Sequence, residues 1–137
     1  MFYKMIENKC KEWYSSDQCT VRNLIEYIEK TGQMRDAQIE AIKVYLFLKI
    51  GCECKPLEFL FRYGCFNSIN LNDIELSTAT REYLEENPAA TALFEYSRLT
   101  NDKGEQVSEK LEKQIKKDPS SIDYDAFFRT AFYGVSY

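Results

Sequence analysis

The chain has 137 residues, of which 45% are hydrophobic and 15% aromatic, so we expect one globular domain spanning residues 1–137. Its formal net charge of -4 argues against an overall positive field of the kind that collects nucleic acid or anionic membranes. Charged residues of both signs are mixed along the chain, which excludes the single-sign composition typical of disordered segments.

Signals for secretion and for membrane insertion are missing from the sequence. The longest apolar-rich run, Ile39–Ile50, contains charged residues and is too short to cross a bilayer. The first residues lack the basic end, the apolar stretch and the small-residue cleavage site of a signal peptide. We therefore expect a cytoplasmic protein without a membrane partner, in which the five cysteines are reduced thiols.

Apolar residues recur mostly at steps of three and four, and this spacing predicts an all-α fold, an irregular bundle of about seven to eight helices. In chain order, the first helix is expected over Tyr3–Tyr14. The second is expected over Thr20–Lys30, with Thr20 as its N-cap and Gly32 ending it in a left-handed conformation. The third, Arg35–Ile50, is apolar around most of its circumference, so we expect it to be the central helix.

The second half of the chain continues the helical pattern. Pro56 is suited to open a short helix that Gly64 closes, and a polar connection follows it. Ser77, the pair Asn87-Pro88 and Asp123 are suited to start later helices. The expected segments are a helix from Ser77 to Asn87, a helix over Ala89–Leu99, a loop over Thr100–Gly104, a charged surface helix over Glu105–Lys117 and an aromatic helix from Tyr124 that Gly134 terminates.

Several kinds of catalytic centre are excluded by the composition. The chain has no histidine, so it lacks the bases of Ser-His and Cys-His nucleophiles and the ligands of most zinc sites. Its five glycines are isolated, so no glycine-rich loop can hold a nucleoside triphosphate. Cys52 and Cys54 are separated by one residue, with only Cys65 nearby, which is not the spacing of a zinc knuckle. We expect no catalytic residue, metal site or cofactor in this chain.

Gln38 is the residue that the helical pattern does not explain. At about 100° per residue, it falls on the side of the third helix that carries Ala41, Ile42 and Tyr45. A buried amide without a hydrogen-bond partner costs about 1–3 kcal/mol, so we expect Gln38 to be bonded. A nearby backbone carbonyl, the preceding loop, a ligand edge and another domain are all open as its partner.

Gln38 lies in the string Met-Arg-Asp-Ala-Gln-Ile-Glu-Ala-Ile over Met34–Ile42. This string resembles the Leu-Arg-x-x-Gln-x-Glu-Ala-Ile element that precedes the motor of many superfamily-two helicases and of type I or type III restriction translocases. Further segments occur in an order similar to the front end of bacterial DEAD/DEAH-box helicase family proteins related to type III restriction enzyme motor subunits. The resemblance covers roughly Tyr27 to the end, and these segments are Thr31–Arg35, Lys55–Leu57, Leu76–Thr78 and Pro88–Ala90.

The resemblance implies a role for this chain within a larger machine. In those families the glutamine is associated with the adenine of ATP, whose amino group and ring nitrogen match the acceptor and donor of a side-chain amide. Gln38 would take that role and Arg35 would support it. ATP and Mg²⁺ would then be cofactors of the parent protein and not of this chain. The implied partners are the motor domain downstream in the same polypeptide and, through it, DNA.

The family's G-K-[ST] nucleotide loop is absent from this chain, although about a hundred residues follow Gln38. Either the helical segment after Gln38 is an insertion between the two elements, or Gln38 belongs to a separate front domain. We therefore expect a non-catalytic N-terminal helical domain that serves protein or substrate contacts and ends before the ATPase motor.

Two other functions remain open. A free-standing helical interaction module would expose aromatic rings, and the C-terminal segment supplies such rings, although they can instead close the domain's own core. The candidates are Phe127, Phe128, Phe132, Tyr133 and Tyr137. A weak nucleic-acid-binding domain would use the lysines of one helix, which are interleaved with glutamates. These lysines are Lys110, Lys113, Lys116 and Lys117.

Overall fold

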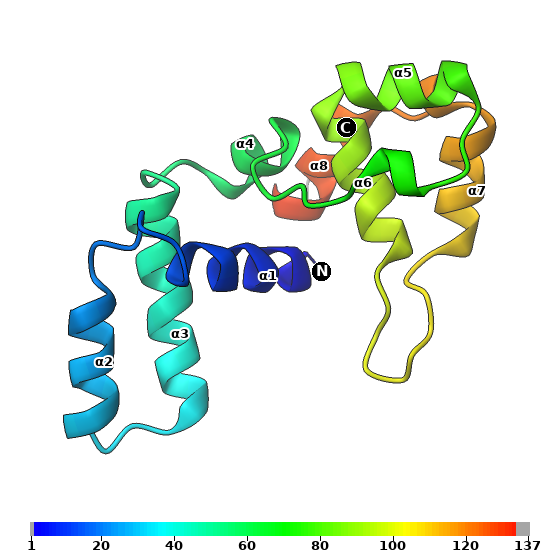
Figure 1. The fold of residues 1–137 in the computed structure, drawn as a ribbon. Helices are drawn as coiled ribbons and strands as arrows, with labels where there is room; N and C mark the ends of the chain where they lie inside the picture. The colour runs from blue at the N-terminus through cyan, green and yellow to red at the C-terminus, as the bar shows by residue number, and fades with distance from the viewer. Residues whose placement is uncertain (1, 134–137) are drawn as a thin grey trace. The chain divides into compact units, whose positions relative to one another are not determined.

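The fold is assembled from helices. A computed structural model of the chain describes residues 2–133. Within this range it has eight α-helices and no strand, and one isolated β-bridge joins Thr100 to Gln106 (Figure 1). The predicted all-α class is thereby confirmed. None of the helices in the described range is long and apolar enough to cross a membrane.

The packing of the chain separates it into two compact units, Met1–Pro56 and Leu57–Tyr137. Each of the two units has its own set of helices, and the single domain expected over residues 1–137 stays a prediction. The break falls at Pro56, the residue that was expected to open a helix. The element around Gln38 and the helices after Pro56 therefore belong to different units.

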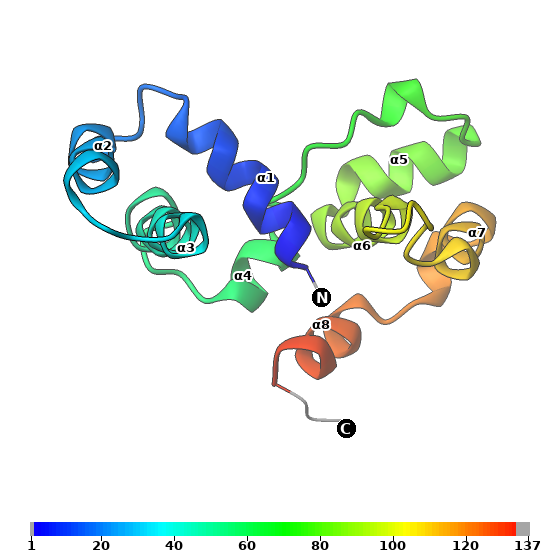
Figure 2. The ribbon, with the colours of Figure 1, turned by 90° about the horizontal axis from the view of Figure 1, so that it is seen from below.

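The first unit consists of three α-helices and one short π-helix. α2 and α3 are antiparallel and lie side by side, and α1 packs against α3 and the π-helix (Figures 1 and 2). The ring of Trp13 in α1 meets the ring of Phe47, with their centroids 5.6 Å apart. The elements are α1 Tyr3–Tyr14, α2 Arg22–Thr31, α3 Asp36–Leu46 and the π-helix η1 Phe47–Gly51.

α1 spans the predicted residues, but both ends of α2 differ from the prediction. α2 begins at Arg22 and not at Thr20, and no side chain caps it. The guanidinium of Arg22 donates hydrogen bonds to the backbone oxygens of Tyr14 and Ser16, which fixes the turn between α1 and α2. Gly32 has an extended conformation (φ -82°, ψ 147°) and not a left-handed one. The chain therefore leaves α2 directly into the loop before α3.

The third predicted helix is not uniform, but it is central to the first unit, where α1, α2 and the π-helix all pack against α3. α3 ends at Leu46, and the chain continues as a π-helix to Gly51. Ile39 is the buried residue of α3, and Phe47 is the buried residue of the π-helix. Most of the circumference of residues 35–50 was expected to face protein, and this expectation is wrong among the residues that the structure describes. α1 and α2 cover one edge of α3, and its other apolar side chains are exposed or half-buried.

The second unit is organised around α6. This helix packs against α4, α5, α7 and α8, and it is therefore the central helix of the second unit. Its buried residues are Ala90, Thr91, Ala92, Leu93, Phe94 and Ser97. The elements of the unit are α4 Leu57–Arg62, the 3-10 turn η2 Leu71–Asp73, α5 Thr78–Glu86, α6 Pro88–Arg98, α7 Glu109–Lys117, the 3-10 turn η3 Pro119–Ser121 and α8 Tyr124–Tyr133.

Three buried polar side chains of the second unit, Thr80, Thr91 and Ser97, are hydrogen-bonded to the backbone, whereas Oδ1 of Asn67 and Nε of Arg81 are buried without a hydrogen-bond partner among the described residues. The hydroxyl groups of Thr91 and Ser97 each donate to a backbone oxygen at 2.6 Å. The hydroxyl of Thr80 in α5 donates to the backbone oxygen of Lys116 in α7 at 3.2 Å. This last hydrogen bond connects two helices that are far apart in the sequence.

Side chains cap several helices of the second unit, as the sequence predicts for two of them. Oγ of Ser77 accepts a backbone hydrogen bond at 3.2 Å, and Oδ1 of Asp123 accepts one at 3.1 Å. α7 is capped by Ser108 and begins at Glu109, so the predicted start at Glu105 is wrong. The cause is the preceding loop, in which the backbone N–H of Ser108 donates to the oxygen of Ser97 and holds the chain in a hairpin-like turn.

Gly64 follows α4 in a left-handed conformation with φ +74°, consistent with its predicted role of ending that helix. A Cβ at this position would lie 2.8 Å from the amide nitrogen of Asn67 and 3.0 Å from Cβ of Pro88. Glycine is therefore required here both by the backbone conformation and by the close packing. Gly134, the predicted terminator of the last helix, lies outside the described residues.

Candidate functional site

Gln38 lies in the first turn of α3, and its side chain folds back onto the start of the helix. Its Oε1 accepts a hydrogen bond from the backbone N–H of Arg35 at 2.9 Å. In return, the backbone N–H of Gln38 donates to the backbone oxygen of Arg35, also at 2.9 Å. Gln38 is the third residue of α3, and the bond from the N–H of Arg35 to its Oε1 is the one that a side chain at this position makes in a capping box. Gln38 therefore has a partner in the preceding loop, which is one of the expected alternatives.

Burial of Gln38 was expected, and this expectation is wrong: its side chain is exposed to solvent. The helical wheel does place it on the side of α3 that carries Ala41, Ile42 and Tyr45. Ala41 and Tyr45 are exposed as well, and Ile42 is half-buried. α1 and α2 pack against the other edge of α3. No helix in the described part of the first unit therefore covers the side of α3 that carries Gln38.

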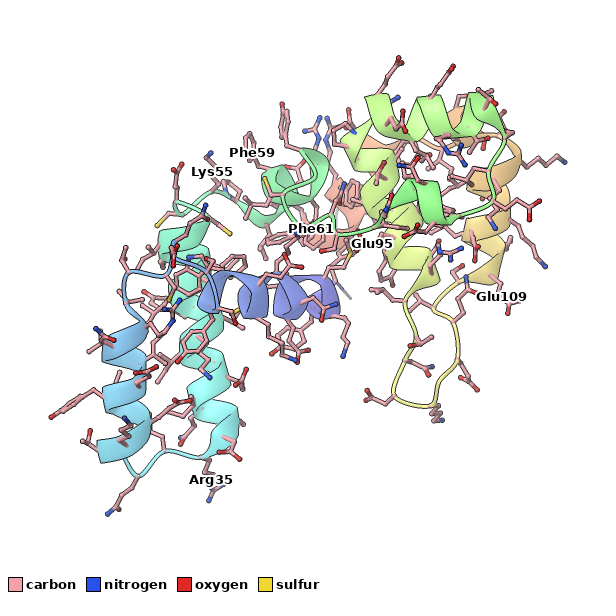
Figure 3. The ribbon with its side chains drawn as sticks, viewed as in Figure 1. Arg35, Lys55, Phe59, Phe61, Glu95 and Glu109 are labelled. Carbon is pink, nitrogen blue, oxygen red and sulfur yellow. The ribbon has the colours of Figure 1, made fainter. Side chains whose placement is uncertain are left out.

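Arg35, the residue expected to support Gln38, is the N-cap residue of α3 and lies exposed at the loop end of the α2–α3 pair (Figure 3). Its backbone contacts Gln38, as described above, whereas its guanidinium forms no ion pair within the described part of the chain. The two predicted site residues are thus brought together. Both present polar groups to solvent at the same end of the helix.

The exposed side of α2 and α3 forms an apolar surface, which we call the open face. α1 lies on the side of the pair that is marked by Arg22 in α2 and Phe47 after α3. At about 100° per residue, the opposite side of the two helices carries a different set of residues. This set is Leu24, Tyr27 and Ile28 from α2, with Gln38, Ala41, Ile42 and Tyr45 from α3. The exposed fractions are 52% for Leu24, 65% for Tyr27 and 59% for Tyr45.

On the other side of α3, a charged cluster joins the helices of the first unit. Nζ of Lys43 lies 3.1 Å from a carboxylate oxygen of Glu29, 3.5 Å from one of Glu40, and 4.6 Å from the ring centroid of Tyr14. Burial opposes the charge of Lys43, but the hydrogen bond to Glu29 and the nearby carboxylates outweigh it and raise its pKa. Lys43 therefore stays protonated and ties α2 to α3. It cannot act as a base near neutral pH.

The five cysteines are free thiols in different surroundings: Cys10, Cys19 and Cys52 are buried, and Cys54 and Cys65 are exposed. Burial and the charge of Glu40 raise the pKa of Cys10 to about 11, so this thiol is protonated at neutral pH and a poor nucleophile. Nowhere in residues 2–133 do three or more metal-ligating side chains gather in one place.

A shallow hollow in the second unit, with a volume of about 340 Å³, lies between the starts of α6 and α8. Its lining includes Arg62 at the end of α4, the following residue Tyr63, and the two acidic residues Asp123 and Asp125. The guanidinium of Arg62 is paired with Glu58 at 3.2 Å and with Asp125 at 2.9 Å. Because these carboxylates already neutralise Arg62, the hollow offers poor complementarity to a phosphate or another anion.

The aromatic side chains of α8 lie at different depths. Phe128 is 0% exposed, Phe127 and Phe132 are half-buried, and Tyr133 is 59% exposed. The rings of Phe128 and Phe132 stack near that of Phe61 in α4, with centroids 6.3 Å and 5.3 Å away. Among the described members of the predicted interaction set, Tyr133 is therefore the ring that lies at the surface. Tyr137, the remaining member, lies outside the described residues.

The basic side chains of α7 are partly neutralised by a carboxylate of the same helix. Glu112 pairs with Lys116 at 3.0 Å and with Arg98 of α6 at 2.7 Å, and it accepts a further hydrogen bond from Gln106. Burial opposes the charge of Glu112, but the hydrogen bonds from Gln106 and Lys116 and the nearby cations outweigh it and lower its pKa. The other lysines of the predicted basic set are exposed, and they are Lys110, Lys113 and Lys117.

No protein-family model, curated protein or solved structure matches this chain. Two features of the first unit stand out: the polar groups of Gln38 and Arg35 at the start of α3, and the open face beside them.

Proposed function

We propose that this chain is the non-catalytic N-terminal helical region of an ATP-dependent helicase or restriction-type translocase, which works in the cytoplasm. The observation that carries the proposal is the exposed Gln38 at the start of α3, within the helicase-like element Met34–Ile42. The partner of the chain is then the motor domain of the same polypeptide. That parent protein, and not this chain alone, binds ATP, Mg²⁺ and DNA.

The geometry at Gln38 suits the recognition of an adenine edge. Its Oε1 accepts one hydrogen bond from Arg35, which leaves a second lone pair for an adenine amino group. Its Nε2 makes no hydrogen bond to any described residue and is available to donate to a ring nitrogen. The capping hydrogen bond also fixes the side chain before a ligand arrives, which lowers the entropy cost of binding.

The division into two units supports one of the two explanations for the distance between Gln38 and the family's nucleotide loop, namely that a helical segment is inserted between them. The glutamine element lies in the first unit, and the helices from Leu57 onward form a unit of their own. A separately packed unit is what an insertion between the glutamine element and the nucleotide loop requires. We therefore propose that residues 57–137 are such an inserted helical unit.

The genomic reading frame after Tyr137 is the first test of this parentage. We expect it to continue and to encode a G-K-[ST] loop, because the chain itself lacks one. A stop codon at this point would refute the proposal. The purified chain should not hydrolyse ATP, and turnover by this chain alone would contradict the assignment of catalysis to a motor.

The role of Gln38 is tested in the parent protein by Gln38→Glu. A carboxylate can still accept the capping hydrogen bond from Arg35, but it cannot donate to adenine, so helix stability is kept while one ligand contact is lost. We expect KM for ATP to rise about tenfold to a hundredfold, with KM for GTP unchanged. Gln18→Ala, at an exposed glutamine of the same unit, is the control. Equal losses with ATP and GTP would exclude adenine recognition by Gln38.

The open face supports a second candidate, a free-standing helical interaction module. A continuous exposed apolar surface is a stronger indication of a protein interaction site than apolar residues scattered singly over the surface. The two candidates differ in the sequence after Tyr137 and in the nucleotide dependence of Gln38→Glu. Nucleic-acid binding by the lysines of α7 is a weaker alternative, and it predicts DNA binding by the chain alone that falls steeply with salt.

A further inference from the structure

We propose that the open face binds one amphipathic helix of a partner protein, and that this helix carries acidic residues at both of its ends. The inference goes beyond the helicase parentage and does not depend on it. It uses the exposure of the side chains on α2 and α3 and the charges at the two ends of the face.

The size of the open face fits a single helix. Leu24, Tyr27 and Tyr45 are each more than half exposed. Together these three side chains expose an area on the order of 400 Å², which lies within the range of about 300–600 Å² for the largest apolar patch of a monomer, a patch that is often functional. It is smaller than the roughly 800 Å² per partner of a standard stable interface. A helix laid along two antiparallel helices buries an area of this order and completes a small bundle.

The charges around the open face are positive at both of its ends. Arg35 lies at the N-terminal end of α3, and Lys49 lies one turn beyond Tyr45, with its Nζ 5.7 Å from the centroid of the Tyr45 ring. Neither cation forms an ion pair with a described residue. They are about 20 Å apart along the helix, at about 1.5 Å per residue. In a chain of net charge -4, these two positions favour a partner that is acidic at both ends.

The acidic residues of α2 and α3 are directed away from the open face. Glu29 and Glu40 are held by Lys43 on the side toward α1, and the wheel places Glu26 and Asp36 on that same side. The face itself is formed by apolar side chains and the neutral amide of Gln38. An acidic partner therefore meets no like charge across the centre of the surface.

A second copy of this chain is a poorer occupant than an acidic helix. A symmetric dimer through the open face pairs α3 with its own copy, either antiparallel or parallel. The antiparallel arrangement brings Arg35 of each copy toward Lys49 of the other, and the parallel arrangement brings each cation toward its own counterpart. Like charges facing one another oppose association, so the charge pattern disfavours self-pairing.

The test uses the full chain and two fluorescein-labelled peptides in an anisotropy titration. Both peptides are designed amphipathic helices of about 20 residues with the same leucine stripe, long enough to span the face. One carries glutamates at both ends, and the other carries lysines there. We expect the acidic peptide to bind about tenfold more tightly than the basic one. The double variant Arg35→Glu, Lys49→Glu should reverse this preference.

Variants of the apolar centre separate binding to the open face from binding elsewhere. Ala41→Glu places a charge at an exposed position, so the fold should persist while the affinity for the acidic peptide falls at least about tenfold. Lys103→Glu, at an exposed position in the loop after α6, is the matched control and should change nothing. Circular dichroism confirms that each variant is folded.

Three results would overturn the proposal. The first is that neither peptide binds, and the second is that both bind equally to the chain and to its Arg35→Glu, Lys49→Glu variant. The third is a dimer in sedimentation velocity that Ala41→Glu dissociates, which would identify a second copy as the occupant. None of these results bears on the sequence after Tyr137, so this proposal and the helicase parentage fail separately.

Discussion

Truncation of the Phe128 ring tests whether α8 closes the core of the second unit. Phe128 is 0% exposed, and its ring lies 6.3 Å from that of Phe61, centroid to centroid. Replacing a fully buried phenylalanine by alanine costs about 3–5 kcal/mol, through lost burial and the cavity that remains. A whole domain is stable by only about 5–15 kcal/mol, so Phe128→Ala should remove a large part of the stability of this unit.

Tyr133→Ala is the matched variant on the same helix. Its ring is 59% exposed, and its hydroxyl donates to Glu58 at 3.3 Å on the surface, so we expect a loss below about 1 kcal/mol. The assay is urea unfolding followed by far-UV circular dichroism, paired with hydrogen exchange of the α6 amides, which reports on the second unit alone. If both variants cost the same, or if α6 stays equally protected in Phe128→Ala, the assignment of Phe128 to the core is refuted.

Backbone strain, thiol accessibility and a paired carboxylate give three further predictions. Gly64→Ala should cost about 1–3 kcal/mol in urea unfolding, because a left-handed φ of +74° and a contact at 2.8 Å both oppose a side chain. A thiol reagent near neutral pH should label Cys54 and Cys65 fast and Cys10 slowly, because Cys10 is buried with its pKa raised to about 11. The folded-state pKa of Glu112 lies below its ordinary 4.5, so its stabilising contribution is present above that value and is lost as the pH falls through the folded-state pKa. Glu112→Gln should therefore flatten the decline of the urea midpoint below about pH 5.

Each of these predictions has a control within the chain. Gly104 also has a positive φ of +78°, but nothing lies within 4 Å of an added Cβ, so Gly104→Ala should cost less than Gly64→Ala. Equal costs would exclude crowding at Gly64. Glu109→Gln, at an exposed position of the same helix, should leave the acid response unchanged. Labelling of Cys10 as fast as that of Cys54 in the native protein would contradict its burial.

Some helix ends could be predicted from local chemistry, although Thr20 and Asn87, which were also expected as N-caps, make no side-chain cap. α1 matches its predicted span, and the caps formed by Ser77 and Asp123 follow from side chains that accept backbone hydrogen bonds. Ser108 was missed as a cap. The loop before it is closed by backbone hydrogen bonds to residues at the end of α6, and no pattern of side chains indicates such bonds. The start of α7 was therefore placed too early.

The surroundings of α3 could not be predicted in the same way. The spacing correctly grouped Gln38 with Ala41, Ile42 and Tyr45 on one side of the helix. The same spacing of apolar residues is found on a helix face that is buried in a core and on one that is exposed to a partner, so it does not predict burial. Exposure depends on which other helices pack nearby, and α1 and α2 both pack on the opposite edge.

The contact between Trp13 and Phe47 also provides a spectroscopic probe. Trp13 is the one tryptophan of the chain, it is 5% exposed, and it belongs to the first unit. Its emission therefore monitors that unit alone, without a label or a mutation, while circular dichroism sums over both units. Transitions that differ between these two signals would measure how far the units unfold independently.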